Sequence, residues 1–367
     1  KHATEGDRGT VINRQNYEQF TAYLDYLQHV MQLNAGSVRR NSCWLKHLLR
    51  WADERALIQA HKIRPVFPQY LANTRDRNTG NQLSKGGVGR ACQTARAFFR
   101  WAKKHFPRDY RRISAAWVQT LQPPRMSDEA PKQREVVVLE KVRQLVAVPD
   151  NDNLRVRRDQ AAAAFLFLSG MRGTAFCTMP IKCLEVAERT VMQYPSMGVK
   201  TKNRKAAITH LLNIPDLLEV IESWDDFVSA ELPSSALWYP PIQGSFGNLR
   251  FMNVKPGRYR GETLRTNIRR LFQLAKLKPM SPHKFRHGHA VYGLQQAVNM
   301  GDYKAVSQNL MHANLGITDS IYAMLSDADV SDRIANLGNG VDSNQRPDHL
   351  GLTDNELVTL RKVLAKL

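Results

Sequence analysis

The stretch Ser281-Pro282-His283-Lys284-Phe285-Arg286-His287 has the form of a helix beginning. Serine is a favourable N-cap residue, and proline suits the first helical position. His283 and Arg286 would then lie on one helical face, three residues apart and close to the N-terminus. The N–H groups and partial positive charge at that end favour a phosphate. Because His-x-x-Arg alone is a common pattern, a surface pair of cations is the competing interpretation.

The whole chain is basic. Its 367 residues include 53 Lys and Arg against 33 Asp and Glu, which gives a net charge of +20. Residues 1–130 contribute +12 (22 basic, 10 acidic) and the remainder +8 (31 basic, 23 acidic). Such a charge predicts binding to a polyanion, most often nucleic acid, along both halves. A basic structural protein whose charge serves solubility is the alternative.

Composition excludes other classes. Hydrophobic residues make up 43%, which excludes wholesale disorder. The longest apolar candidate, 161–169, is far shorter than the roughly 18 residues that span a bilayer. No signal-peptide pattern opens the sequence, so a cytoplasmic, nucleoid-associated protein without membrane contact is expected. The four cysteines lack zinc or disulfide spacing; we expect reduced, small core residues and no metal site.

The spacing of apolar residues predicts a helical domain over 13–121, after a flexible N-terminus at 1–12. Helices are expected from Asn13 and over 37–55, 66–75 and 84–105, without strand signals. In the first helix the apolar repeat consists of Tyr17, Phe20, Leu24, Leu27 and Met31. The segment 122–131 has three prolines in ten residues and is predicted to be a linker.

A second domain over 132–337 is predicted to be mainly α-helical with a small β insert. The strand-like runs 188–194 and 206–211 flank the basic turn 200–205. The expected helices cover 159–168, 216–230, 263–275, 283–298, 303–310 and 317–326. The tail 338–367 ends in an amphipathic helix with a capping-box match. That helix is a candidate contact with another protomer, or it packs on its own domain.

Further candidate residues stand on both sides of the His-x-x-Arg pattern. Arg172 follows Leu168-Ser169-Gly170-Met171, at a glycine-flanked helix boundary, and Tyr322 follows Leu310-Met311-His312 by ten residues. The set Arg172, Lys200, His283-x-x-Arg286, His312 and Tyr322, in this order, resembles the tyrosine recombinase (phage integrase, Xer-type) family. The resemblance covers about 10–335.

The resemblance implies two domains, a helical core-binding domain and a catalytic domain, that form a C-shaped clamp around double-stranded DNA. It implies that Tyr322 is the nucleophile of a 3′-phosphotyrosyl intermediate and that Arg172 and Arg286 bind the scissile phosphate. His283 would transfer a proton, Lys200 would be the general acid, and His312 would donate a hydrogen bond. Strand exchange between two sites implies a homo-tetramer on DNA, from a monomer or weak oligomer when free.

The chemistry needs these residue types. Two arginines bind phosphate oxygens bidentately, and preorganised cations stabilise the negative charge of the transition state. Tyrosine, whose pKa is near ~10, needs a base or a positive field, and a lysine can protonate the leaving oxygen. The phosphotyrosine ester conserves the bond energy, so no metal, ATP or other cofactor is expected.

Two positions depart from the family pattern and indicate a divergent member. Ala175 stands where an acidic residue is common, and Met311 replaces the glycine of Leu-Gly-His. Lys202 competes with Lys200 as the catalytic lysine. A type IB topoisomerase and a non-catalytic DNA-binding relative are the alternatives. The sequence does not distinguish integrase, transposase, resolvase and invertase, and it gives no target site, accessory proteins or directionality.

Basic residues outside the predicted active site are candidates for DNA contacts. In the first domain they lie on predicted helices, and a helical face in the major groove is the expected mode. A solvated charged face is the alternative. The candidates are Arg39, Arg40, Lys46, Arg90, Arg96, Arg100, Lys103 and Lys104, with Lys202 and Arg204 in the basic turn.

Overall fold

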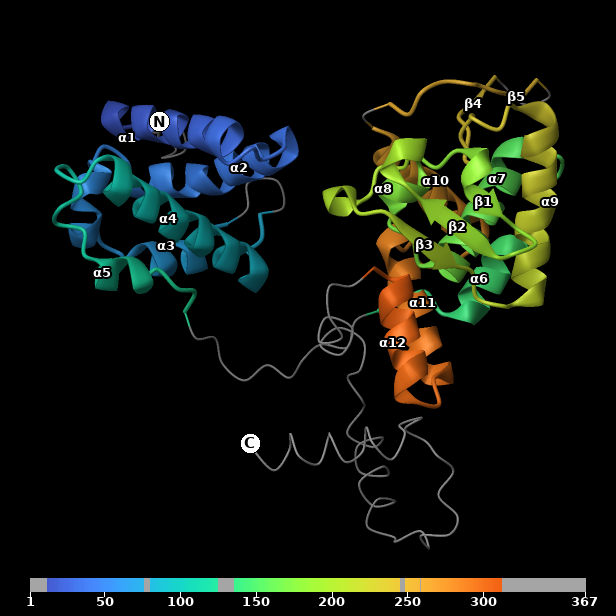
Figure 1. Cartoon of the computed structure of the whole chain (residues 1–367). Coiled ribbons are helices and arrows are strands. Elements are labelled where there is room, and N and C mark those ends of the chain that lie inside the picture. The colour runs from blue at the N-terminus through green and yellow to red at the C-terminus, as the bar shows by residue number, and fades with distance from the viewer. Residues whose placement is uncertain (1–11, 76–79, 125–134, 245–247, 258, 312–367) are drawn as a thin grey trace, which may run out of the picture. The chain divides into compact units, whose positions relative to one another are not determined.

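The computed structural model describes residues 12–75, 80–124, 135–244, 248–257 and 259–311 (Figure 1). The chain divides into two compact units, Lys1–Pro131 and Lys132–Leu367. Most of the predicted linker, the predicted helix at 317–326 and the C-terminal tail lie outside the described residues. No helix in the described part is long and apolar enough to cross a membrane.

The first unit is built from helices, four of which begin at a side-chain cap. The side chains of Asn13, Asn34, Ser84 and Ser114 each accept a hydrogen bond from a backbone N–H of the helix that follows. The elements are α1 (Arg14–Asp25), the π-helical η1 (Tyr26–Val30), α2 (Ala35–Ala52), η2 (Leu57–Lys62), α3 (Phe67–Asn73), α4 (Lys85–His105) and α5 (Ala115–Gln119).

Aromatic side chains from α1 and α4 form the centre of this unit. The Phe20 and Phe98 ring centroids lie 4.6 Å apart, in an edge-to-face arrangement. Apolar residues on the inner sides of α2 and α4 are buried, among them Leu45, Leu48, Phe98 and Phe99. The repeat predicted for the first helix is wrong at its ends, because Tyr17 is 60% and Met31 53% exposed.

The buried face of α1 is instead completed by two polar residues. The Leu57 N–H donates to Asn16 Oδ1 (2.8 Å), and Asn16 Nδ2 donates to the Arg55 carbonyl (2.9 Å). The Tyr110 hydroxyl donates to Gln19 Oε1 (2.5 Å). Both polar residues are buried because the rest of the unit supplies their partners, which apolar periodicity does not reveal.

The second unit is arranged around α7 (Leu154–Ser169), which packs against four other helices (Figure 1). Its run from Arg158 to Ser169 is buried throughout. The packed helices are α6 (Leu139–Val146), α9 (Pro215–Glu231), α10 (Arg260–Leu274) and α11 (Pro282–Gln296). The other α-helices in the described part of this unit are α8 (Gly173–Phe176) and α12 (Met300–Asn309).

The β insert of this unit is an antiparallel sheet with the order β1-β2-β3. Its strands are β1 (Leu184–Glu185), β2 (Thr190–Gln193) and β3 (Ala207–His210), with Val191 opposite Thr209. Short 3₁₀ turns lie at η3 (Ile181–Cys183), η4 (Pro195–Met197) and η5 (Lys202–Arg204). A second hairpin, β4 (Ile242–Gln243) and β5 (Arg250–Phe251), was not predicted.

The predicted fold class, mainly α with a small β-sheet, is confirmed. One prediction about the cysteines is wrong. Cys92, Cys177 and Cys183 are buried, but Cys43 is exposed on α2. Its position there is on the opposite side of the helix from the leucines that fill the core. In the described residues no group of three or more His, Cys, Asp or Glu side chains is placed to hold a metal ion.

Candidate active site

The predicted arginine Arg172 lies at a sharp turn between two helices. α7 ends at Gly170, which has a φ of 59° and whose N–H donates to the Leu166 carbonyl (3.2 Å). A Cβ at Gly170 would lie only 2.7 Å from Cδ2 of His289, so this position also needs glycine for space. Two residues later, half-buried Arg172 is the N-cap of α8.

The predicted His-x-x-Arg pair begins α11, as expected. Ser281 occupies the N-cap position, although its side chain makes no capping hydrogen bond, and Pro282 is the first residue. His283 is exposed, and its ring centroid lies 4.5 Å from that of His287. Arg286, one turn from the helix start, is only 3% exposed. α11 therefore presents the histidine at the surface and holds the arginine inside.

Arg286 connects two segments that are distant in sequence. Its Nη1 donates to the Gly170 carbonyl at 2.7 Å, and its Nη2 donates to the Leu310 carbonyl. Gly170 lies two residues before Arg172, and Leu310 lies two residues before His312. The buried guanidinium of Arg286 thus joins the segment that precedes Arg172 to the segment that precedes His312. His312 and Tyr322 themselves lie outside the described residues.

The end of α12 is also fixed to the sheet. Asn309 Oδ1 accepts the His210 N–H (2.7 Å), and Asn309 Nδ2 donates to the His210 carbonyl (3.0 Å). The same amide nitrogen lies 3.4 Å from Nε2 of His289. Since the ring Nδ1 lies 2.8 Å from the Phe167 carbonyl, we assign the neutral tautomer that donates from Nδ1. Burial lowers the pKa of His289 to about 4, which agrees with that assignment.

The basic turn between β2 and β3 carries Lys200, Lys202 and Arg204, all exposed. The Lys200 backbone N–H donates to Thr178 Oγ1 at 2.8 Å. Because Thr178 lies six residues after Arg172, this bond brings the Lys200 turn against the Arg172 region. Lys202 and Arg204 form η5, further along the turn. The structure therefore brings together the segments of Arg172, Arg286 and Lys200.

A buried polar cluster lies behind α8. Asp159 accepts hydrogen bonds from Arg158 (Nη2, 2.8 Å), the Tyr239 hydroxyl (2.7 Å) and Arg270 (3.0 Å). Burial raises the pKa of Tyr239, so its hydroxyl stays protonated and donates. The Tyr239 ring packs 5.3 Å from that of Phe176, the last residue of α8. The cluster supports the turn that holds Arg172.

Sequence reasoning missed this cluster, Thr178 and Asn309. Asp159 was placed at the start of an apolar helix, with nothing to indicate that Tyr239 and Arg270 would reach it. Thr178 and Asn309 have ordinary side chains whose partners are backbone groups of distant segments. No local signal in the sequence distinguishes them from other threonines and asparagines.

The DNA-contact candidates of the first unit differ in exposure. Lys46 and five others are exposed, whereas Arg96 and Lys103 are half-buried. The Lys103 ammonium donates to the Ile113 carbonyl, so it also serves the fold of its own unit. Positions 90, 93, 97, 100 and 104 of α4 follow one another at spacings of three and four residues, so they share one face of the helix. Three of them are exposed basic residues: Arg90, Arg100 and Lys104. We call this face the α4 stripe.

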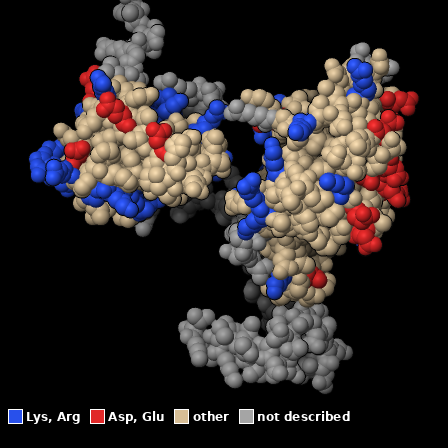
Figure 2. Space-filling view, turned by 45° about the horizontal axis from the view of Figure 1, so that its top comes forward, with Lys and Arg blue, Asp and Glu red and all other residues tan. Residues whose placement is uncertain are grey.

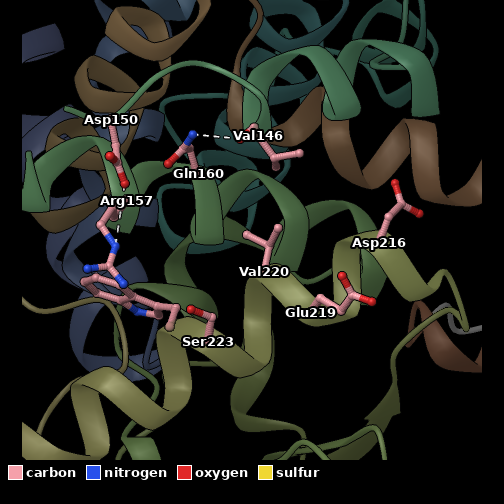
Figure 3. A pocket seen from close by; sticks show the side chains of 9 residues that line it. Val146, Asp150, Arg157, Gln160, Asp216, Glu219, Val220 and Ser223 are labelled. Carbon is pink, nitrogen blue, oxygen red and sulfur yellow. Dashed lines mark hydrogen bonds and ion pairs between the residues drawn. The ribbon is translucent and has the colours of Figure 1, made fainter. Parts of the chain in front are cut away.

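In the second unit the acidic side chains gather on α9, away from the predicted active site. Figure 2 shows them along the right-hand edge of this unit, where Figure 1 shows α9. A cavity of about 290 Å³ between α6, α7 and α9 lies on this side, with the Arg157–Asp150 ion pair at its rim (3.7 Å; Figure 3). None of its lining residues belongs to the predicted site. The exposed acidic residues of α9 are Asp216, Glu219, Glu222, Asp226 and Glu231.

Known structures share this fold. A fragment of the Tn1549 transposon integrase, in complex with circular intermediate DNA, is 13% identical and superposes with a TM-score of 0.56, covering 87% of this chain and 99% of that one. The lambda integrase dimer bound to a COC′ core site is 12% identical with a TM-score of 0.58, covering 83% and 76%. At such low identity these likenesses show the fold, which is that of integrases.

The family follows from a separate comparison. The model of the phage integrase family matches residues 135–329, more than half of the chain. The protein therefore belongs to this family of tyrosine recombinases, enzymes that cut and rejoin DNA, and the departures at Ala175 and Met311 make it a divergent member. A search of curated proteins finds no match.

Proposed function

We propose that this protein is a site-specific DNA recombinase that cleaves and rejoins duplex DNA through a 3′-phosphotyrosyl intermediate on Tyr322. The observation that carries the proposal is the pair of hydrogen bonds from Arg286 to the Gly170 and Leu310 carbonyls. They bring the segments that lead into Arg172 and His312 to one guanidinium. The DNA complexes of the two similar integrases support a DNA substrate.

In the proposed reaction Arg172 and Arg286 bind the non-bridging oxygens of the scissile phosphate, and His312 donates a further hydrogen bond. The Tyr322 oxygen attacks phosphorus, and its proton passes to His283. The bond from phosphorus to the 5′ oxygen breaks, and that oxygen takes a proton from Lys200. The reverse steps with a new 5′ hydroxyl rejoin the strand, and the chemistry needs neither metal nor ATP.

Exchange between two sites requires two cleavages at each site, so we propose a homo-tetramer on DNA. The two units would clamp the duplex, with the basic residues of the first unit contacting phosphates. A type IB topoisomerase would instead relax supercoiled DNA as a monomer. Incubation with two differently labelled target duplexes separates these functions, because recombinant products form only by strand exchange.

The decisive experiment uses a nicked suicide duplex from the genomic flank of the gene. The wild-type chain should form an SDS-resistant adduct, and mass spectrometry should map the linked peptide to Tyr322. Tyr322→Phe should abolish the adduct, whereas Tyr303→Phe, which removes a hydroxyl on α12, should retain it. An adduct that survives in Tyr322→Phe would show that another residue is the nucleophile.

A further inference from the structure

The hydroxyl of Thr178 joins the lysine turn to the segment that follows Arg172. Its oxygen accepts the Lys200 backbone N–H at 2.8 Å. The same oxygen lies 3.0 Å from the Thr174 carbonyl and 3.2 Å from the Ala175 carbonyl, so its one proton points back into α8. The hydroxyl therefore uses both its donor and its acceptor capacity, one on each side.

This contact is shielded from water. Thr178 is 4% exposed, and Val199, the neighbour of Lys200, is 1% exposed and belongs to the hydrophobic core. A buried hydrogen bond of this kind is costly to leave unmade, because water does not replace the lost partner. The main chain is thus fixed at Val199 and at the amide of Lys200, while the lysine side chain itself is exposed.

The backbone around Lys202 is held less firmly than that around Lys200. Lys202 opens η5, where Asn203 has a φ of 58° and residues 202–206 are exposed. The backbone bonds there are local and long: Arg204 N–H to the Thr201 carbonyl and Lys205 N–H to the Lys202 carbonyl, both 3.4 Å. The backbone of Lys200 is therefore held in place near Arg172, whereas the backbone of Lys202 is not held in this way.

We propose that Thr178 is a positioning residue that selects Lys200, rather than Lys202, as the lysine that protonates the leaving 5′ oxygen. The proposal rests on the proposed function, because it concerns the acid of that same cleavage step. A lysine side chain is long and flexible, so the position of its backbone sets which atoms its ammonium reaches. A misplacement of about 1 Å can cost about 10²-fold in rate.

The test compares two leaving groups in the same nicked suicide duplex. One substrate has the ordinary 5′ oxygen at the scissile phosphate, and the other has a bridging 5′ sulfur. A thiolate leaves without a proton, so loss of the general acid slows cleavage of the oxygen substrate alone. Thr178→Val removes the hydroxyl and preserves the side-chain shape, whereas Thr178→Ser retains the hydroxyl.

For Thr178→Val we expect cleavage of the oxygen substrate to fall about 10- to 100-fold and that of the sulfur substrate by less than about 3-fold. Thr178→Ser should stay within about 3-fold of wild type on both. Equal losses on both substrates would show that Thr178 only supports the fold and would overturn the proposal. If Thr178→Val does not fold, Thr178→Ala, with its fold checked by circular dichroism, takes its place.

The lysines supply the matched controls. Lys200→Ala should show the same selective loss, and Lys202→Ala should not. Sulfur rescue of Lys202→Ala instead would assign the acid to Lys202 and refute the proposal. The proposed function fails separately, if wild-type protein forms no adduct with either substrate. If the adduct forms and Lys200→Ala is rescued but Thr178→Val is not, only the role of Thr178 is wrong.

Discussion

The two compact units bury different kinds of polar side chain. In the described part of the first unit the buried polar residues are neutral: Asn16, Gln19 and Thr94. The second unit also buries charged and titratable side chains, Arg158, Asp159, Arg260, Arg286, His287 and His289. Burial of charge costs free energy unless the charge is paired and hydrogen-bonded. The second unit must therefore pair or hydrogen-bond these buried charges, which lie around the predicted active site.

Within the second unit, buried charge is held in two ways. Around Asp159 the arginines meet a carboxylate, so opposite charges compensate. Arg286 donates to the Gly170 and Leu310 carbonyls, which orient its guanidinium. The comparison indicates that the Asp159 cluster serves the fold, whereas the carbonyl bonds of Arg286 join two segments of the predicted site.

The largest effect should follow from removing the carboxylate of the compensated cluster. Asp159→Asn leaves Arg158 buried without its counter-charge, and should lower the free energy of unfolding by about 3–5 kcal/mol. Asp150→Asn, which breaks the half-exposed pair with Arg157, should cost less than about 1 kcal/mol. Urea denaturation measures both values. Similar losses for the two variants would show that the buried cluster does not stabilise the unit.

The next effect concerns His289, which the second unit buries in its neutral form. The folded pKa of about 4 lies below the ordinary value of 6.5. The unfolded chain therefore binds a proton first as pH falls, and stability is lost between pH 6.5 and about 4, by about 3 kcal/mol in all. Stability should be constant with respect to this group above pH 6.5.

Urea titrations at a series of pH values test this linkage. His289→Gln lacks the titrating group, so its stability should depend less on pH in that window, whatever its stability at pH 7. Hydrogen exchange in the full chain should place the difference in the second unit, near α7 and α11. Parallel pH curves for wild type and His289→Gln would contradict the neutral, buried assignment.

In the first unit a neutral polar residue should matter less. Asn16→Ala leaves the Leu57 N–H and the Arg55 carbonyl without their side-chain partner, and should cost about 2 kcal/mol, detected as faster exchange in the first unit alone. Asn41→Ala, which removes a bond to the Ser37 carbonyl within α2, should cost about 0.5 kcal/mol or less. A larger loss of stability from Asn41→Ala than from Asn16→Ala would show that the bonds of the buried Asn16 are not the more important ones.

Much of the fold could be predicted because its signals are local. The Ser281-Pro282 pair predicts the start of α11, and the apolar spacing predicts the helix over 84–105 that the structure shows as α4. The predicted face of the first helix was wrong only at its ends, and it omitted Asn16, which is buried by bonds to residues about 40 positions away. Local patterns hold no information about such partners.

The candidate site likewise contains residues that the sequence predicts and contacts that it does not. Arg172, Lys200, His283 and Arg286 were predicted because their types and order resemble the tyrosine recombinase set, and their catalytic roles stay predictions. The residues that contact their segments could not be predicted. Thr178 contacts the backbone of Lys200, with β1 and β2 between them in sequence, and Asp159 meets Tyr239 80 positions later. Such contacts arise only when the chain folds.

The smallest effect should come from the α4 stripe, where single phosphate contacts are expected. Arg100 is exposed on the stripe, whereas the ammonium of Lys103 donates to the Ile113 carbonyl. Each lost phosphate contact reduces the slope of log affinity against log salt by about 0.9. Arg100→Gln should therefore lower that slope by about 0.9 and leave stability within about 0.5 kcal/mol of wild type.

Lys103→Gln should do the reverse, with little change in the salt slope and a loss of stability in the first unit, because its ammonium already has a partner there. Fluorescence anisotropy with a labelled duplex over a range of salt concentrations measures the slope, and urea denaturation measures the stability. If both variants reduced the slope equally, Lys103 would leave the Ile113 carbonyl to contact DNA. Exposure would then be no guide to which of these adjacent cations binds phosphate.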